Sequence, residues 1–189
     1  MSGSLFDSTG ARKYLIDSER RAFAREAKRE VNTKRLFCLA LAASGARISE
    51  LLATTAESID RENGTLILRT LKQREKLSFR SVPLPRNLVS QLLKSIPAEN
   101  GPIWDWGRTN AWQMVKAVMR RAGISENLCK PKALRHGFAV SAGLAGVPLN
   151  VVQRWLGHAR LETTAIYMSI VGPEERLLAK RTWQALNID

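Results

Sequence analysis

Apolar residues recur at intervals of three and four along most of the chain, which is the spacing that gathers them on one face of a helix. In one well-defined segment the apolar positions are Leu36, Leu39, Ala40 and Ala43. Asn32 is suited to cap the start of that helix and Gly45 to end it, while Asp17 or Ser18 is the expected cap of an earlier helix. The pattern predicts helices over residues 17–30, 32–44, 86–95, 109–121, 133–145, 148–156, 162–170 and 173–186, with a short further helix or turn over 47–53.

The pattern changes in the first half of the chain, where short runs favour β-strands. These runs span residues 58–60, 65–69 and 77–82. Asn63-Gly64 predicts a turn, and the charged stretch over 72–76 suits the tip of a hairpin. The chain is therefore predicted to be mainly α, with a small three-stranded antiparallel β-sheet inserted early.

Length and composition fit one domain with a buried core, because the chain has 189 residues and 44% of them are hydrophobic. We expect this domain over residues 17–189, after a flexible lead-in over 1–16. Cys38 and Cys129 lack the spacing of a metal site and are expected to be inert thiols in a reduced compartment. Neither an export signal nor a membrane-spanning run is visible in the sequence, so a cytoplasmic location is expected.

The charge balance points to a polyanionic partner. Thirty Lys and Arg residues against 17 Asp and Glu leave a formal net charge of +13. A surplus of this size attracts nucleic acid, which is the commonest partner of such a domain. Charge alone is also compatible with a solvated basic surface or with a binding protein that has no chemistry.

Histidine and tyrosine are scarce, with two of each in the chain, so their positions are informative. His158 closes the run Trp155-Leu-Gly-His, and Tyr167 follows nine residues later. Arg47 and Arg135 each stand near the start of a predicted helix, where a planar guanidinium can be presented to a phosphate. Any one of these residues alone would more often be a packing residue or a salt-bridge partner.

Taken in order, these segments resemble the catalytic domain of the tyrosine recombinase (phage integrase) family over residues 32–183. The matching segments are SGARISELL with Arg47, KALRHGFA with Arg135, LGH at residues 156–158, and Tyr167 at the interval usual for the family. Each is weak evidence alone, but all of them in this order, with the predicted sheet between the first two, are specific. The resemblance implies the catalytic-domain fold of that family.

The resemblance also implies an enzyme that cuts and rejoins double-stranded DNA without a metal or a cofactor. Tyr167 is expected to attack phosphorus, giving a 3′-phosphotyrosine and a free 5′-hydroxyl, and this covalent bond retains the energy for religation. Arg47 and Arg135 are expected to hold the non-bridging oxygens and to stabilise the charge of the transition state. His158 is expected to hydrogen-bond the scissile phosphate.

In the family, a lysine on a β-hairpin gives a proton to the leaving 5′-oxygen. Lys72 is preferred for this role because it directly follows the predicted strand, and Lys76 is the alternative. Further contacts to the DNA backbone are expected from Arg74, Lys76, Lys130 and Arg160, since lysine and arginine neutralise phosphates.

The sequence departs from the family at one position. The second motif usually reads His-x-x-Arg, and its first position here is Lys132. Lys132 and Arg135 are expected on one helix face, where Lys132 can still donate to a phosphate oxygen, although a cation is a poor acceptor for the tyrosine proton. His136 turns about 100° away from Arg135 around the helix, so we expect it to pack behind the site rather than to replace the missing base. Glu50, one turn after Arg47, is expected to support that arginine.

The expected function is site-specific recombination for the integration, excision, inversion or resolution of a mobile element. Two alternatives are a type IB topoisomerase, which relaxes supercoils without pairing sites, and a DNA-binding protein that has kept the fold and lost the chemistry. The first motif begins by residue 44, so no separate N-terminal core-binding domain is expected in this sequence, which is either a short single-domain form or a part of a longer protein. Accessory DNA-binding proteins and association with the nucleoid of a bacterial cell are expected instead.

The resemblance further implies assembly on DNA. In the family a tail helix often docks on the neighbouring protomer. We therefore expect a protein that is a monomer in dilute solution, that forms a tetramer on paired DNA sites, and that needs the segment after Gly172 for strand exchange.

Overall fold

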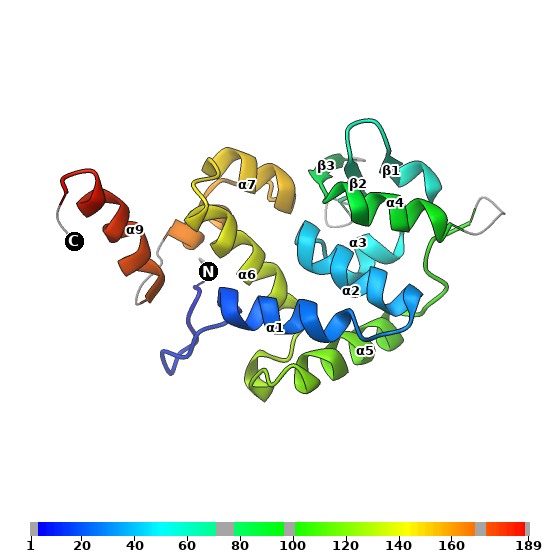
Figure 1. Ribbon diagram of the computed structural model, residues 1–189, viewed down its shortest axis with the longest axis horizontal. Coiled ribbons are helices and arrows are strands. Elements are labelled where there is room, and N and C mark those ends of the chain that lie inside the picture. The colour runs from blue at the N-terminus through cyan, green and yellow to red at the C-terminus, as the bar shows by residue number, and fades with distance from the viewer. Residues whose placement is uncertain (1–3, 71–77, 97–100, 169–172, 188–189) are drawn as a thin grey trace.

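The computed structural model describes residues 4–70, 78–96, 101–168 and 173–187, and within them the chain is mainly helical with one small sheet, as predicted (Figure 1). The α-helices are α1 (Asp17–Ala27), α2 (Asn32–Ser44), α3 (Ile48–Leu52), α4 (Arg86–Lys94), α5 (Arg108–Arg121), α6 (Pro131–Leu144), α7 (Leu149–Leu156), α8 (Glu162–Ala165) and α9 (Pro173–Gln184). Short 3₁₀ helices are η1 (Ala56–Ser58), η2 (Glu126–Leu128) and η3 (Ile166–Met168).

The sheet is antiparallel in the order β1-β2-β3. Its strands are β1 (Ile59–Asp60), β2 (Thr65–Arg69) and β3 (Phe79–Pro83). Gly64 has a φ of +65°, which confirms the turn predicted between the first two strands. Exposure alternates along β3, and Arg80 and Val82 point inward. The predicted hairpin tip, which contains Lys72, Arg74 and Lys76, lies outside the described residues.

Helix α2 lies among the other helices, and α1, α4 and α6 pack around it (Figure 1). Its side chains Leu36, Phe37 and Leu41 are buried. Gly45 ends α2 in the left-handed region with a φ of +61°, as the sequence predicted. A Cβ at Gly45 would lie 2.4 Å from Cδ1 of Phe138, so the glycine also permits the close approach of α6. The break before α3 therefore lies against α6.

The N-terminal segment differs from the loose lead-in that was expected. In its described part, Leu5, Tyr14 and Leu15 are buried in the core. The Leu15 N–H donates to the carbonyl of Ala133 at 3.2 Å. A Cβ at Gly137 would lie 2.5 Å from the Leu15 carbonyl oxygen, so α6 accepts this segment only because it has no side chain there. Polar composition suggested a free segment, but a few apolar residues suffice to dock it.

The predicted caps of α1 and α2 are wrong. Ile16 precedes α1, and its N–H donates to the Glu19 carboxylate at 3.0 Å. The Asp17 carboxylate lies in the first turn and accepts a hydrogen bond from Ser141 of α6. Val31 precedes α2, and the Asn32 side chain accepts from Arg35 at 2.7 Å. The Asp17 oxygen is thus taken by a residue of another helix, and the Asn32 oxygen by an arginine one turn further along α2.

The C-terminal part of the chain is also divided differently from the prediction. The helix expected over residues 162–170 is the short α8, which tightens into η3 and carries Tyr167. Helix α9 lies at one edge of the molecule, beyond α6 (Figure 1). Its end exposes Trp183 by 37%, and Leu186 just after it by 68%. Within the described ranges, no helix combines the length and the apolar character that a bilayer crossing needs.

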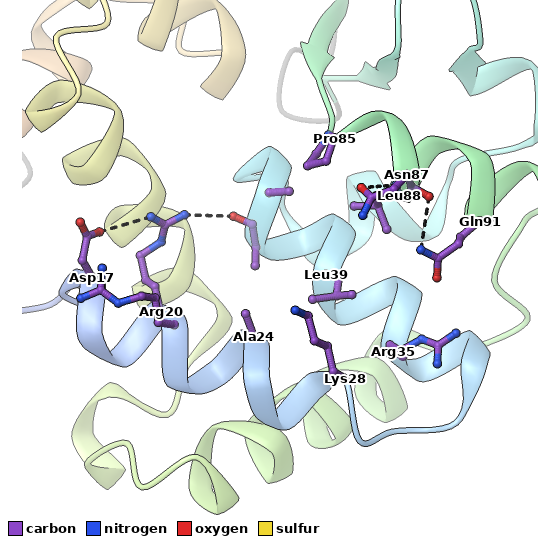
Figure 2. A pocket seen from close by; sticks show the side chains of 13 residues that line it. Asp17, Arg20, Ala24, Lys28, Arg35, Leu39, Pro85, Asn87, Leu88 and Gln91 are labelled. Atoms are coloured by element: carbon purple, nitrogen blue, oxygen red, sulfur yellow. Dashed lines mark hydrogen bonds and ion pairs between the residues drawn. The ribbon is translucent and has the colours of Figure 1, made fainter.

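A groove of about 820 Å³ lies between α1, α2 and the start of α4 (Figure 2). Its basic lining residues are Arg20, Arg21, Lys28 and Arg35, and its apolar ones include Ala24, Leu39 and Leu88. Asp17 is the acidic residue of the lining, and its carboxylate lies 3.5 Å from the Arg20 guanidinium. This groove shares no lining residue with the candidate site described next.

Candidate active site

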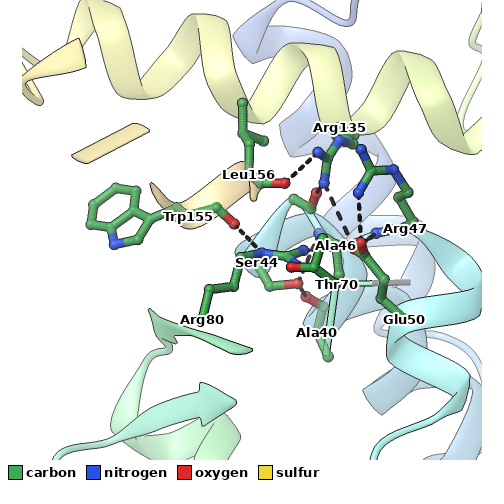
Figure 3. Close-up of polar contacts among 11 residues, drawn as sticks. Ala40, Ser44, Ala46, Arg47, Glu50, Thr70, Arg80, Arg135, Trp155 and Leu156 are labelled. Carbon is green, nitrogen blue, oxygen red and sulfur yellow. Dashed lines mark hydrogen bonds and ion pairs between the residues drawn. The ribbon is translucent and has the colours of Figure 1, made fainter. Parts of the chain in front are cut away.

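Arg47 stands immediately before α3, at the break that Gly45 creates (Figure 3). Its backbone N–H donates to Glu50 Oε2 at 2.9 Å, and its guanidinium Nη1 donates to Oε1 at 2.6 Å. The glutamate therefore fixes both the start of the helix and the direction of the arginine. The Arg47 side chain is still 35% exposed, so part of its guanidinium is open to a ligand.

The Glu50 side chain is fully buried and is also bound by a second arginine, which the sequence analysis missed. Arg80 of β3 donates to Glu50 Oε2 at 2.6 Å and to the Trp155 carbonyl at 2.7 Å (Figure 3). Burial alone would raise the pKa of Glu50, but the hydrogen bond and charge of Arg80, together with the N–H and charge of Arg47, lower it below its ordinary value. Glu50 is thus an ionised carboxylate held between two cations.

A signal for Arg80 existed in the sequence. It shares the inward face of the 77–82 strand pattern with Val82. An arginine at such a position is almost never buried unless it is paired, so it predicts a buried acidic partner. Glu50 is that partner in the structure.

Arg135 on α6 is buried and bonds to the ends of two helices (Figure 3). It donates to the carbonyl of Gly45 at 2.7 Å, just after α2, and to that of Leu156 at 2.5 Å, the last residue of α7. Its Nη1 lies 3.9 Å from Glu50 Oε2. Burial, followed by the charge of Arg47, lowers the pKa of Arg135 to about 9, so it remains a cation at neutral pH. A cation is well placed at helix C-termini, where backbone carbonyls lack intrahelical partners.

His158 follows α7 after Gly157, which takes a φ of +64° and turns the chain. Its Nδ1 lies 2.9 Å from Thr164 Oγ1, and this contact fixes the orientation of the ring. Burial and the charges of Arg135 and Arg47 lower the pKa of His158 to about 3, so the ring is neutral at pH 7. Thr164 is a site residue that the sequence analysis did not identify.

Tyr167 is 1% exposed and lies between the two histidines of the chain. Its hydroxyl lies 2.8 Å from Nδ1 of His136, and its ring stacks on that of His158 with centroids 6.3 Å apart and planes 14° apart. Burial raises the pKa of Tyr167, and the charges of Arg135 and Arg47 offset part of this effect. The hydroxyl is therefore a neutral phenol in the electrostatic field of both arginines.

Three further predicted basic residues that the structure describes are not drawn into this cluster. Lys132 is exposed on α6, although it lies one turn before the buried Arg135, and no hydrogen bond among the described residues ties it to the site. Lys130 is exposed at the start of α6, and Arg160 is exposed and paired with Glu162 at 3.3 Å. These exposed residues are open to a partner, whereas Arg135 and Tyr167 are inside the protein.

A hollow of about 270 Å³ opens beside His158 and Arg80, between β3 and α7. Its lining also includes Thr70, Phe79, Gln153 and Arg154. The site therefore has a polar opening next to the histidine. In the part of the chain that the structure describes, no three His, Cys, Asp or Glu side chains come together as a metal site would require.

Comparisons with known proteins identify the family. Residues 16–171 match the phage integrase family. Tyrosine recombinase XerA of Pyrococcus furiosus is 31% identical over 148 residues, which cover 72% of this chain and 50% of that protein. The chain spans about half the length of the curated relatives it matches.

Solved structures share the fold. The crystal structure of XerA recombinase superposes with a TM-score of 0.77 at 23% identity, covering 89% of this chain and 64% of that chain. XerH site-specific recombinase, bound to its difH substrate in a pre-cleavage complex, gives a TM-score of 0.71 at 20% identity, with 94% and 59% covered. The predicted tyrosine recombinase fold is thereby confirmed.

Proposed function

Because the chain belongs to the phage integrase family, we propose that it is a site-specific recombinase that cuts and rejoins DNA through Tyr167. The observation that carries this proposal is the convergence of residues from distant segments. Arg47 and Arg135 meet at the carboxylate of Glu50, Arg135 reaches the end of the helix that precedes His158, and His158 stacks on Tyr167. Packing of the core alone gives no reason for two arginines, a neutral histidine and a tyrosine to gather in one cluster.

The arginines would bind the non-bridging oxygens of the scissile phosphate. Attack at phosphorus adds negative charge to those oxygens, and guanidinium donors fixed in advance stabilise this charge without reorganising. Glu50 orients Arg47, and the helix-end carbonyls orient Arg135. The neutral ring of His158 would donate a further hydrogen bond to the same phosphate.

Tyr167 would be the nucleophile. Its oxygen would form a bond to phosphorus while the bond to the 5′-oxygen breaks, which leaves a 3′-phosphotyrosine and a 5′-hydroxyl. Its hydroxyl is buried here, so η3 must shift outward before a phosphate can reach it. The leaving oxygen needs a proton, for which Lys72 is the proposed donor and Lys76 the alternative.

Double-stranded DNA is the proposed partner. The net charge of +13 favours it, and XerH, which has the same fold, has been crystallised on its own DNA substrate. We further propose action on a mobile element, with protomers assembling as a tetramer on two sites.

The direct test is capture of DNA as a covalent adduct. Purified protein is incubated with labelled duplexes that tile the DNA flanking its coding sequence, and adducts are resolved under denaturing conditions. The wild-type protein should form an adduct that maps to Tyr167. Tyr167→Phe removes one oxygen and should abolish the adduct while leaving DNA binding nearly unchanged.

An adduct of normal yield from Tyr167→Phe, or one that maps to Tyr14, would overturn the assignment. A supercoiled plasmid that lacks any captured sequence distinguishes a topoisomerase from a recombinase. Relaxation of that plasmid at the same rate as one with two captured sequences would identify a topoisomerase instead of a recombinase.

A further inference from the structure

The Tyr167 hydroxyl lies within hydrogen-bond distance of His136. Tyr167 Oη lies 2.8 Å from His136 Nδ1, which is a full hydrogen-bond contact. A phenol is protonated at neutral pH and must lose this proton as its oxygen attacks phosphorus. Lys132, which stands where the family usually has a histidine, is a cation and has no lone pair to receive it.

We propose that His136 accepts this proton, a role that rests on the function proposed above. As the bond between Tyr167 Oη and phosphorus forms, the O–H bond breaks and the proton passes to the lone pair of His136 Nδ1. The bond from phosphorus to the 5′-oxygen breaks in the same step, and that oxygen takes its proton from the hairpin lysine. In religation the 5′-hydroxyl attacks phosphorus and gives its proton back to the hairpin lysine. The bond from phosphorus to Tyr167 Oη breaks in the same step, and His136 returns its proton to that oxygen.

The position of His136 next to Arg135 on α6 suits this role. Consecutive side chains on a helix point about 100° apart. This separation argued against His136 in the sequence, because it was expected to turn the ring away from the site. In the structure, Arg135 reaches the carbonyls of Gly45 and Leu156 while His136 reaches the hydroxyl. His136 thus contacts the phenol directly, while Arg135 acts on it through its charge.

His158 is less suited to accept the proton. Its Nδ1 is already engaged by Thr164 Oγ1 at 2.9 Å. Its ring plane lies within 14° of the plane of the Tyr167 ring, at a centroid distance of 6.3 Å. The lone pair of an imidazole nitrogen lies in the ring plane, so two stacked rings do not direct it at the hydroxyl of the other. The His136 ring is instead inclined by 49°, and its edge meets the hydroxyl.

The charges around His136 keep its lone pair available. Burial, then the charges of Lys132, Arg135 and Lys13, lower its pKa to about 4, so the ring is neutral at pH 7. A bound phosphate would bring negative charge to Arg135 and offset part of this effect at the moment when the base is needed. Lys132 thus acts on the imidazole through its charge.

The experiment measures the rate of adduct formation in a single turnover, on a duplex that the wild-type protein captures. His136→Ala removes the acceptor, whereas His136→Asn places an amide oxygen near the position of Nδ1, where it accepts a hydrogen bond but takes no proton. Both variants should be slower by on the order of 10²-fold, the usual contribution of a general base. If His136 only orients Tyr167, His136→Asn would stay within a few-fold of the wild type, and the proposal would be overturned.

A second variant set tests the proton itself. Replacing Tyr167 with 3,5-difluorotyrosine makes the phenol more acidic and reduces its need for a base. It should restore much of the rate lost in His136→Ala, and absence of any rescue would count against proton transfer. Lys132→Ala is the comparison on the same helix: its loss should not be restored by 3,5-difluorotyrosine, and a loss that is restored as in His136→Ala would assign the role to Lys132.

The contact can be checked without DNA. The chain has two histidines, so ¹⁵N spectra of the imidazoles are assigned by one variant each. Nδ1 of His136 should be unprotonated in the free protein, and its resonance should move in Tyr167→Phe; a protonated Nδ1, or no change, would overturn the proposal. Wild-type protein that captures no duplex would overturn the proposed function and this role with it. Capture by the wild type and undiminished capture by His136→Ala would overturn the role of His136 alone.

Discussion

The Glu50 carboxylate is buried between guanidiniums that serve different parts of the candidate site. Arg47 is partly exposed, whereas Arg80 is 3% exposed and joins β3 to the end of α7 through the Trp155 carbonyl. Two ionised groups inside a protein are stable only as a pair with further hydrogen bonds. Removing the charge of Glu50 therefore leaves Arg80 buried without its counter-ion.

Glu50→Gln should lower the free energy of unfolding by about 3–5 kcal/mol, as for other buried ion pairs that lose one partner. Urea denaturation measures this change. Glu126→Gln is the matched control, because Glu126 also bonds two cations, Lys116 at 2.6 Å and Arg120 at 2.8 Å, but is 59% exposed. Equal small effects from both variants would show that the network around Glu50 contributes little.

The two histidines make stability dependent on pH. Burial and neighbouring cations lower the pKa of His136 to about 4 and that of His158 to about 3, from an ordinary value of 6.5. Below pH 6.5 both histidines become protonated in the unfolded chain while they stay neutral in the folded protein, so protonation favours unfolding. The histidine contribution to stability is complete above this pH and is lost as the pH falls toward 4.

The melting temperature should accordingly drop between about pH 7.5 and about pH 5, a window in which most carboxylates stay ionised. His158→Gln removes one of the two titrations and should make the drop smaller. An identical drop in the variant would mean that groups other than His158 set the pH dependence.

Residues that belong to a sequence motif could be identified from the sequence. Residues whose role depends on where the side chain points in the folded protein could not. The resemblance of their motifs to the tyrosine recombinase family singles out Arg47, Arg135, His158 and Tyr167, and the structure brings them together. The contact of His136 with Tyr167 was not foreseen, because its direction around α6 was judged against Arg135 instead of against the incoming η3. Such a contact depends on packing between segments, which spacing does not encode.

At the scale of elements, α6 carries Arg135 and His136 and is supported from behind by the N-terminal segment. Gly137 makes this possible, since a Cβ there would lie 2.5 Å from the Leu15 carbonyl and 3.1 Å from Cδ of Arg20. The Leu15 carbonyl is a backbone group and cannot move away from a Cβ as the end of a flexible side chain can. The glycine is thus required by a neighbouring segment, although it lies in the middle of a helix.

Gly137→Ala should therefore destabilise the protein by about 1–3 kcal/mol, the usual effect of overpacking. In an open helix the same change would stabilise by about 1 kcal/mol, so the sign is diagnostic. Gly107→Ala is the control, because a Cβ at Gly107 meets nothing within 4 Å. Denaturation curves that show Gly137→Ala to be neutral or stabilising would contradict the close packing of Leu15.

Helix boundaries show the same difference between features set by neighbouring residues and features set by contacts between distant segments. The glycine that ends α2 was predicted correctly, because a left-handed residue is a local property. The start of α1 was placed on the wrong cap, because Asp17 bonds to Ser141, far away in sequence. Alternation predicted β3 correctly, and the same alternation placed Arg80 inside the protein, where only the fold provides Glu50.

At the scale of the whole molecule, positive charge is not confined to the candidate site. The groove between α1, α2 and α4 has four basic residues and one acidic residue in its lining (Figure 2). Long-range attraction to a polyanion depends on this surplus, whereas selection of one phosphate depends on the few arginines held by fixed partners. Affinity and chemistry are therefore carried by largely different residues.

Helix α9 lies at one edge of the molecule (Figure 1). It contacts α6 of its own chain, yet Trp183 and Leu186 at its end are 37% and 68% exposed. Exposed large apolar side chains are a feature of protein interfaces. The helix also follows closely after Tyr167, the proposed nucleophile, in the sequence.

Truncation after Gly172 should spare DNA binding and remove concerted strand exchange, because a tail that docks on a neighbouring protomer would couple one active site to the next. Binding is measured by gel shift on one site, and recombination on a plasmid with two sites. The double variant Trp183→Ala, Leu186→Ala is the matched control, since it keeps the helix and removes its exposed apolar groups, and it should lose strand exchange as the truncation does. Recombination at full rate by the truncated protein would show that α9 serves only its own domain. Loss of binding as well as recombination would show that α9 stabilises the fold, and the trans contact would again be wrong.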